Sequence, residues 1–368
     1  MLTSRKHSAL LPSLIDQFNL NLNGLTVYTE AALGPYLWNA ILAAKAGARV
    51  FAQTVDSRFG TVGDVRRATL TAAAQYGVAD RVEVVAGRDL NGLRVSDIVT
   101  NSGFVRPFDS ELIDALKSTA VVPLMWETWE LREDEFDLER CRARGILVLG
   151  TNELIPPCDM SEYVGYTGLK LLFEAGFDGG NVLLLGSAPI PSRPILHALR
   201  QLGVSVTWGS MSPEADVHYD EMSQHFAEYG SRYDAVILAE HQHPVLLLGK
   251  GGLLEFEAIG AANPELKIGI MCGRIDAEGL SNTAFSWFPR HLQPFGFLSY
   301  QPYMLGRRPV LTLFAAGLKV GQVMSRARLR GLAPSEAAEE ALRTSPAMDF
   351  FGTRAWLPHA RHKGDLRL

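Results

Sequence analysis

Two tryptophans and two carboxylates fall within five residues of this sequence, directly after a strongly apolar run. The segment is Trp126-Glu127-Thr128-Trp129-Glu130, and the run before it reads VVPLM. An indole beside a carboxyl group disfavours the charged form, which raises the carboxyl pKa toward the range useful for proton transfer. We therefore expect Glu127 to act as a general acid or base and Trp126 to contact the substrate. The alternative is a helix start whose acids meet the helix dipole.

A second polar segment also follows an apolar run, at Thr100-Asn101-Ser102-Gly103, and Arg106 comes three residues later. A guanidinium group can clamp a carboxylate or phosphate, while amide and hydroxyl groups supply further donors and acceptors. We expect Asn101 and Arg106 to orient the substrate for catalysis and Ser102 to bind it. A turn closed by the Asn side chain would also explain Asn beside Gly.

Other polar residues follow apolar runs that read as strands. In an open α/β sheet, ligands bind outside the carboxyl ends of the strands. The sequence therefore predicts further substrate-binding residues at Glu30, Asp56, Arg58, Asn152 and Glu153. A helix cap at Glu30 and an ion pair within the turn that holds Asp56 and Arg58 are the alternatives.

The elements that must position these residues alternate regularly. Apolar runs of strand length, such as 25–30 and 49–55, enclose helical patterns such as 35–48. This alternation predicts βαβ units and parallel sheets covered on both faces. At residue 181 the cycle restarts with NVLLLG. We expect an α/β fold of two Rossmann-like, doubly wound parallel-sheet domains with an interdomain cleft.

The predicted domain boundaries divide the chain unevenly. The first domain comprises residues 1–158 together with 310–368, whose C-terminal helices return to it, and it holds the substrate. The second comprises residues 159–309 and is of nucleotide-binding type. The polar ending HARHKGDLRL is expected to be frayed.

Composition narrows the function classes. A chain of 368 residues is long enough for two domains, and 47% apolar with 20% charged residues is typical of a globular protein. A net charge of −5 argues against nucleic acid as a partner. The three cysteines form no CxxC pair, and no run approaches the roughly 18 to 20 apolar residues of a membrane span. We expect a soluble, cytoplasmic protein that acts on a small molecule and binds neither nucleic acid nor a membrane.

The stretch from Asp97 to Phe173 resembles the hinge region of D-2-hydroxyacid dehydrogenases. ELIDALK and VV precede DLERCRARGILVLGTNE, and a long helical pattern follows. NVLLLG then opens a Rossmann unit, and residues 239–280 are similar to that family's later pattern. The resemblance covers about residues 97–280. It implies a nicotinamide-dependent oxidoreductase for a small polar or anionic metabolite, with NAD or NADP as cofactor and a homodimer as the assembly.

The cofactor loop departs from that family's GxGxxG pattern. It reads GSAPIPSRP from Gly186 to Pro194, and its three prolines remove amide donors. Trp208, Gly209 and Ser210 stand where an acid would hold the adenine ribose. The family's catalytic arginine and histidine have no clear counterpart, since Met271 falls at the arginine position. The predicted cofactor-binding residues share a place at the ends of strands in the second domain: Gly186, Ser187, Ser192, Arg193, Glu240 and His241.

Two alternatives stay open. The order of elements in the first domain is also similar to class I S-adenosylmethionine methyltransferases, with TEAALG at 29–34 and Asp56 near the positions of that family's glycine-rich turn and carboxylate. This similarity implies S-adenosylmethionine as an alternative cofactor. A non-catalytic ligand-binding protein with a degenerate cofactor site is the other alternative. No metal site is predicted, because Glu240, His241 and His243 lack a visible third-ligand motif.

Overall fold

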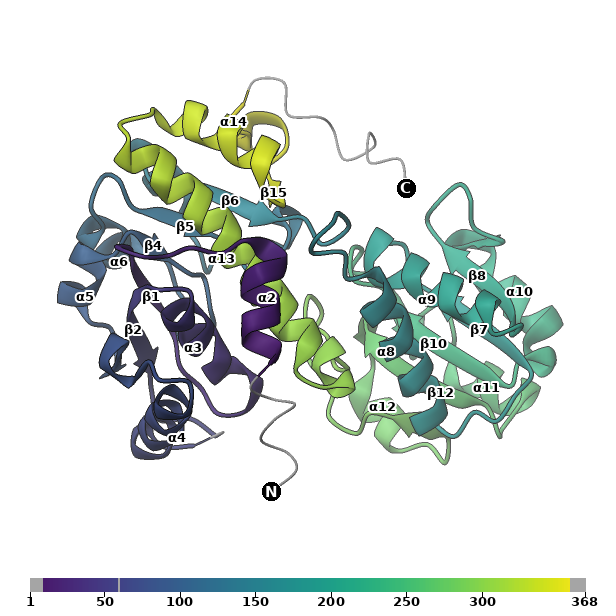
Figure 1. Cartoon of the computed structure of the whole chain (residues 1–368). Coiled ribbons are helices and arrows are strands. Elements are labelled where there is room, and N and C mark those ends of the chain that lie inside the picture. The colour runs from purple at the N-terminus through teal and green to yellow at the C-terminus, as the bar shows by residue number, and fades with distance from the viewer. Residues whose placement is uncertain (1–8, 59, 358–368) are drawn as a thin grey trace. The chain divides into compact units, whose positions relative to one another are not determined.

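The computed structural model describes residues 9–58 and 60–357 (Figure 1). The chain forms two compact units. Unit 1 comprises the residues up to Asp159 and those from Arg307 onward, and unit 2 comprises Met160–Gly306. The ending HARHKGDLRL, predicted to be frayed, lies outside the described residues.

A seven-stranded sheet forms the centre of unit 1, in the order β15-β6-β5-β4-β1-β2-β3. Every neighbouring pair is parallel except β15 with β6, which is antiparallel. The six parallel strands follow the order 3-2-1-4-5-6 of dinucleotide-binding folds, so the strand order reverses between β1 and β4. The strands are β1 (Thr26–Glu30), β2 (Arg49–Thr54), β3 (Val82–Ala86), β4 (Ile98–Val99), β5 (Val121–Pro123), β6 (Leu147–Thr151) and β15 (Ala347–Met348).

Helices cover both faces of this sheet. α3 and the long α13 pack on one face, and α2 lies against them, while α5, α6 and α7 close the core on the other face. Gly317 and Gly321 let α13 approach the sheet closely, because a Cβ there would lie 2.5 Å from Met125 and 2.9 Å from Ile98. The helices of unit 1 are α2 (Leu10–Phe18), η1 (Gly34–Leu37), α3 (Trp38–Lys45), α4 (Val62–Gln75), η2 (Ala79–Arg81), α5 (Leu90–Val95), α6 (Ser110–Ala115), η3 (Thr128–Glu130), α7 (Leu138–Ala143), α13 (Arg308–Leu329), α14 (Pro334–Thr344) and η7 (Gly352–Arg354).

Unit 2 repeats the same strand order in a sheet that is parallel throughout, β14-β12-β10-β7-β8-β9. Its order also reverses at the first strand, between β7 and β10. The strands are β7 (Asn181–Leu185), β8 (Ser205–Ser210), β9 (Val217–His218), β10 (Ala235–Ala239), β12 (Lys267–Cys272) and β14 (Ser286–Phe288), and β11 (Leu246–Leu248) pairs with β13 (Arg274–Ile275) in a separate sheet.

The helices of unit 2 pack on this sheet and on one another. Gly165 and Gly168 bring α8 against α9, since a Cβ at either position would lie under 3.0 Å from Pro194 or Ile195. The helices are α8 (Ser161–Glu174), α9 (Pro189–Gln201), η4 (Tyr219–Glu221), α10 (Met222–Tyr229), η5 (Gly230–Arg232), α11 (Phe256–Ala262), α12 (Ala277–Ser281) and η6 (Pro302–Leu305).

The α/β class with two doubly wound, mainly parallel sheets is confirmed by these strand orders. One local prediction was wrong: residues 187–194 do not form a loop throughout, because α9 already begins at Pro189. Ile190 keeps an extended conformation, so the regular helix starts just after it, and proline is tolerated in a first turn whose amides lack helical partners. Among residues 9–58 and 60–357, no helix combines the length and apolar character that crossing a membrane requires.

Candidate functional site

The carboxyl ends of four neighbouring strands of unit 1 carry most of the polar residues singled out in the sequence. β6, β5, β4 and β1 are adjacent and parallel, so the residues that end them or follow them lie along one edge of the sheet. From β1 to β6 these residues are Glu30, Asn101, Ser102, Trp126, Glu127, Asn152 and Glu153. This is the edge at which an open α/β sheet binds its ligand.

Three carboxylates gather at the β5 and β6 ends of this edge. Glu127 is buried, and its carboxyl group accepts hydrogen bonds from the main-chain N–H of Glu153 at 3.3 Å and from the indole N–H of Trp129. Although Glu153 as a whole residue is only half-buried, burial of its carboxyl group is the main cause that raises its pKa well above the ordinary value, followed by the charges of Glu130 and Glu127. A carboxyl group that keeps its proton beside other carboxylates can serve as a general acid or base.

The thiol of Cys158 lies near the same carboxylates. It is fully buried, and burial together with the charges of Glu153, Glu127 and Asp159 raises its pKa well above the usual range. The reactive thiolate form of this cysteine is therefore disfavoured.

Arg106 lies beside Trp126 and is paired with an acid that the sequence did not single out. Its guanidinium group forms an ion pair with Glu135 and stands 5.0 Å from the centre of the Trp126 ring. Arg132 also reaches Glu135, at 3.4 Å. The arginine is therefore fixed in place by an ion pair and a cation–π contact.

Glu30 ends β1 at the point where the strand order reverses. Its Oε2 accepts a hydrogen bond from the main-chain N–H of Phe104 at 3.1 Å. Burial raises the pKa of this carboxyl to about 7, against the lowering effects of the Phe104 amide and of Arg106. Glu30 therefore changes charge near neutral pH, which the sequence did not predict.

A network of buried hydroxyl and amide groups surrounds the same reversal point. Thr29 Oγ1 accepts hydrogen bonds from Asn39 Nδ2 at 2.9 Å and from Thr100 Oγ1 at 2.7 Å, and the hydroxyls of Thr100 and Ser102 lie 2.8 Å apart. Asn101 Oδ1 accepts from the Met125 N–H at 2.8 Å. Its Nδ2 is buried and has no hydrogen-bond partner among the residues that the structure describes.

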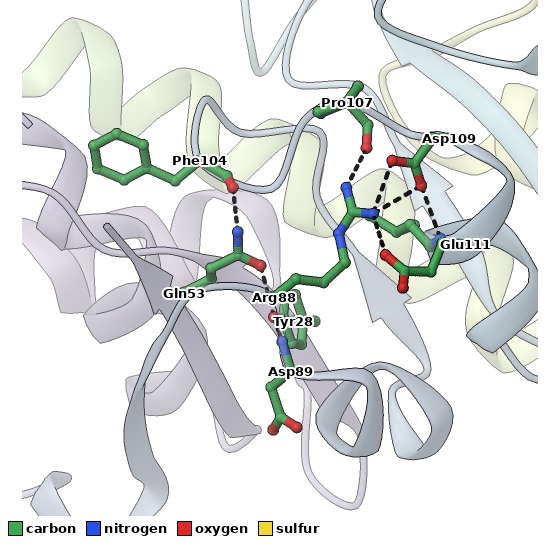
Figure 2. A network of polar contacts seen from close by, with 9 residues as sticks. Tyr28, Gln53, Arg88, Asp89, Phe104, Pro107, Asp109 and Glu111 are labelled. Carbon is green, nitrogen blue, oxygen red and sulfur yellow. Dashed lines mark hydrogen bonds and ion pairs between the residues drawn. The ribbon is translucent and has the colours of Figure 1, made fainter. Parts of the chain in front are cut away.

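The loop after β4 is held in place by a chain of polar contacts, which Figure 2 shows. The side-chain amide of Gln53 donates to the carbonyl of Phe104, and Gln53 Oε1 accepts from the Tyr28 hydroxyl at 2.7 Å. The Tyr28 oxygen in turn accepts from the Asp89 N–H at 3.0 Å. This chain joins β1, β2 and the loop after β3 to the segment that contacts Glu30.

Arg88 holds the far end of the same loop (Figure 2). Its guanidinium group contacts both carboxyl oxygens of Asp109 at 2.8 Å, Glu111 at 3.0 Å and the carbonyl of Pro107 at 2.9 Å. Asp109 also caps α6 by accepting from the Leu112 N–H at 3.0 Å. Residues 101–109 are thus fixed at both ends.

Three other predicted substrate-binding residues have local structural contacts. Asp56 accepts a hydrogen bond from the Val62 N–H at 2.7 Å, at the start of α4. Arg58 is exposed in the turn that Ser57 and Gly60 close with a pair of main-chain hydrogen bonds. Asn152 Oδ1 accepts from the Leu154 N–H at 2.9 Å and shapes the turn after β6.

In unit 2, the predicted cofactor-binding residues follow β7 and β10, and Ser192 and Arg193 lie in the first turn of α9. The carbonyl of Gly186 accepts from the Trp208 indole at 2.8 Å, and Ser187 Oγ accepts from the Met211 N–H at 3.0 Å. The buried Ser192 hydroxyl donates to the carbonyl of Ala239 at 3.1 Å. Each of these groups thus has a partner within the unit.

The remaining predicted cofactor-binding residues of unit 2 also have contacts within it. Arg193 pairs with Glu214 at 2.9 Å. Glu240 is buried and accepts from the main-chain N–H groups of Gln242 and His243 at 2.8 and 2.9 Å, and His241 precedes these two in the loop after β10. Within the described part of the chain, no three His, Cys, Asp or Glu side chains come together as a group that could hold a metal ion.

Sequence reasoning missed several residues that shape these two regions. A signal existed for Gln53 and Asn39, since each is a polar residue inside an otherwise apolar strand or helix pattern. Glu135 and Tyr219 carried no such signal, because their partners Arg106 and Glu240 are distant in sequence.

Comparison with known proteins found no matching family model and no matching curated protein. Solved structures do show similarity. One of the subunits of dipicolinate synthase from Bacillus halodurans is 13% identical, with a TM-score of 0.48 over 84% of this chain and 99% of that chain. A 2-hydroxyacid dehydrogenase from Ketogulonicigenium vulgare is 16% identical, with a TM-score of 0.44 over 84% and 96%. D-lactate dehydrogenase with NAD+ from Lactobacillus jensenii is 9% identical, with a TM-score of 0.44 over 82% and 97%.

The resemblance to D-2-hydroxyacid dehydrogenases found in the sequence is thus found again among solved structures, as a remote likeness of fold. Identities of 9–16% with such TM-scores carry no information on substrate or reaction. The fold assignment rests on the two strand orders themselves.

Proposed function

We propose that this chain is an enzyme that acts on a small polar metabolite by proton transfer at the carboxyl edge of the unit 1 sheet. One observation carries the proposal: Glu153, whose pKa is raised by burial and by neighbouring charge, lies directly beside the buried Glu127 at the ends of two adjacent strands. Two acids with different environments are the usual basis for dividing acid and base roles.

Glu153 is the residue that exchanges a proton with the substrate. As a residue Glu153 is less buried than Glu127, and Glu127 already accepts two hydrogen bonds. Burial, together with the charges of Glu130 and Glu127, keeps the proton on Glu153. The sequence predicts Glu127 as the acid or base, but its burial and its two accepted hydrogen bonds favour Glu153 for that role.

Arg106 and Trp126 form the positioning part of the proposed site. The ion pair with Glu135 and the cation–π contact hold the guanidinium group beside the indole ring. A planar polar substrate could stack on this pair, and the buried amide of Asn101 adds a donor at the neighbouring strand end.

The reaction class implied by the sequence resemblance is oxidation or reduction with NAD or NADP. The strand order of unit 2 supports this class, and NAD+ accompanies the similar D-lactate dehydrogenase. However, the residues of unit 2 do not fit a dinucleotide held in the usual way of this fold, so the proposal rests on the proton-transfer groups of unit 1 alone. S-adenosylmethionine has no support from the similar structures.

The test is to incubate the purified full chain with a metabolite extract, with and without added NADH and NADPH, and to follow substrate loss by mass spectrometry. We expect one small polar metabolite to be consumed, and Glu153→Gln to slow its consumption about 10²- to 10⁴-fold. Glu139→Gln, an exposed position on α7, is the matched control and should keep full activity.

Two results would count against the proposal. Full activity of Glu153→Gln would remove Glu153 from the reaction. A metabolite that binds the chain and is recovered unchanged under every condition would instead indicate the non-catalytic binding protein.

A further inference from the structure

We infer that unit 2 has kept the strand order of a dinucleotide-binding fold but does not bind a dinucleotide at the carboxyl ends of its strands. A chain of contacts through Met211, Ser187, Tyr219 and Glu240, here called the bridge, occupies that position. The inference is independent of the proton-transfer site in unit 1.

The strand order defines what a dinucleotide would need. It would lie across the carboxyl ends of β8, β7 and β10, with its pyrophosphate on the glycine loop and the helix start after β7. An acid at the end of β8 would hold the adenine ribose. In this chain the corresponding end reads Trp208-Gly209-Ser210-Met211 and contains no acid.

The bridge begins at the end of β8. The main-chain N–H of Met211 donates to Ser187 Oγ at 3.0 Å, which ties the glycine loop to the end of the neighbouring strand. This contact stands at the end of β8, where the adenine ribose of a dinucleotide would be held. Ser210, the last residue of β8, is fully buried, and its hydroxyl oxygen accepts from the Ser212 N–H at 2.9 Å.

The bridge continues to β10 through a buried phenol. The Ser187 side chain lies beside the phenol of Tyr219, whose hydroxyl donates to Glu240 Oε2 at 2.8 Å. Glu240 follows β10, and its other oxygen accepts the two main-chain N–H groups of the next loop. Met211, Ser187, Tyr219 and Glu240 thus connect the ends of β8, β7 and β10, which are the three strands that a dinucleotide would cross.

Every group in the bridge has a partner, so none is held open for a ligand. Tyr219 and Glu240 are 4% and 0% exposed, and burial together with the Glu240 charge raises the pKa of the Tyr219 phenol. Because the carboxylate accepts three hydrogen bonds, its burial is compensated without a bound molecule.

The glycine loop itself is also occupied by the protein's own groups. The Trp208 indole donates to the Gly186 carbonyl at 2.8 Å, and the Ser192 hydroxyl donates to the carbonyl of Ala239 at 3.1 Å. Arg193 is the basic residue in the loop and helix start where a phosphate would bind. It is paired with Glu214 at 2.9 Å and lies over the Trp208 ring. Prolines at 189, 191 and 194 remove three of the amides that could contact a phosphate.

The experiment is calorimetric titration of the full chain with NADH and with NADPH, together with hydrogen exchange of residues 186–193 and 208–211 measured with and without each nucleotide. We expect no saturable binding up to about 1 mM and no change in exchange in either segment. Dissociation constants in the micromolar range with protection of these segments would overturn the inference.

A charge-reversal variant distinguishes nucleotide binding at the glycine loop of unit 2 from nucleotide binding elsewhere on the chain. Arg193→Glu places a negative charge beside the loop, so it would weaken at least tenfold any dinucleotide bound in unit 2. Binding that is tight and weakened by Arg193→Glu would contradict the bridge. A nucleotide that instead binds the wild type and Arg193→Glu equally tightly, and leaves residues 186–193 unprotected from exchange, would lie outside the glycine loop. The inference would then be upheld. Neither measurement depends on enzymatic activity. The inference about unit 2 and the proposed function of unit 1 can therefore be refuted separately.

Discussion

The main-chain N–H of Glu153 donates to the carboxyl group of Glu127 across 3.3 Å. This contact follows from the sheet, because β5 and β6 are parallel neighbours and the Thr151 N–H continues their pairing by donating to the carbonyl of Trp126 at 2.9 Å. The strand register therefore brings two acids together that are 26 residues apart in sequence. Two neighbouring carboxyl groups do not both ionise readily, so one of them keeps its proton to a higher pH.

The first prediction concerns the charges around Glu153. After burial, the charge of Glu130 and then that of Glu127 raise the pKa of Glu153, so Glu130→Gln and Glu127→Gln should each lower it, and the double variant should lower it further. Carboxyl-carbon NMR titration of the labelled glutamates measures this. Glu139→Gln, exposed on α7, is the control and should leave the pKa of Glu153 unchanged. A Glu153 pKa that stays the same in both neighbouring variants would refute the electrostatic coupling.

The second prediction uses the buried carboxyl of Glu30. Its pKa is raised from 4.5 to about 7 in the folded chain, so the folded state binds the proton more tightly than the unfolded state. The stability gained from this proton is complete below pH 4.5 and is lost as the pH rises toward 7, by about 3 kcal/mol in total. Glu30→Gln, whose amide resembles the protonated acid, should abolish this contribution and be more stable than the wild type above pH 7.

Urea denaturation at several pH values between about 5 and 8 measures the effect. Glu83→Gln, at an exposed position of β3, is the matched control and should follow the wild-type pH dependence. If Glu30→Gln and the wild type lose stability in parallel as the pH rises, Glu30 is not the titrating group.

The sequence was sufficient for the fold but only partly so for the site. Alternation of strands and helices predicted the α/β class, and Glu30 falls at the end of β1 as its position after an apolar run indicated. The contact partners of the polar residues could not be predicted from the sequence. Contacts such as Arg106 with Glu135 or Ser187 with Met211 depend on the conformation of the loops. Nor could the sequence show that the hydrogen-bond partners of Ser187 and Glu240 are other groups of unit 2.

The third prediction concerns the clamp at the far end of the loop after β4. Arg88→Met removes charge-assisted hydrogen bonds to Asp109, Glu111 and the Pro107 carbonyl while keeping much of the side-chain volume. Because the Arg88 side chain is only 19% exposed, we expect a loss of about 1.5–3 kcal/mol in unfolding free energy, measured by urea denaturation. Arg67→Met, which breaks an ion pair whose arginine side chain is 75% exposed, should cost clearly less, because solvent screens exposed ion pairs. Equal losses in the two variants would show that burial does not strengthen the clamp.

The last prediction tests the close packing of the glycine loop in unit 2. A Cβ at Gly186 would lie 2.2 Å from Ser192 Oγ and 2.5 Å from the main-chain oxygen of Ala239. The hydroxyl could rotate away, but the carbonyl belongs to β10 and cannot move without disturbing the sheet. Gly186→Ala should therefore cost about 3 kcal/mol, and adding Ser192→Ala should restore little of it.

A helical glycine in unit 1 provides the contrast. Gly63 lies in the first turn of α4, and the nearest atom to a Cβ there is Thr61 Oγ1 at 3.7 Å, an ordinary contact. Gly63→Ala should stabilise the chain by up to about 1 kcal/mol, because alanine has less conformational freedom to lose on folding. Urea denaturation of both variants gives the comparison. A Gly186→Ala chain as stable as the wild type would mean that the loop lies farther from β10, and the bridge from Ser187 to Glu240 would lose its support.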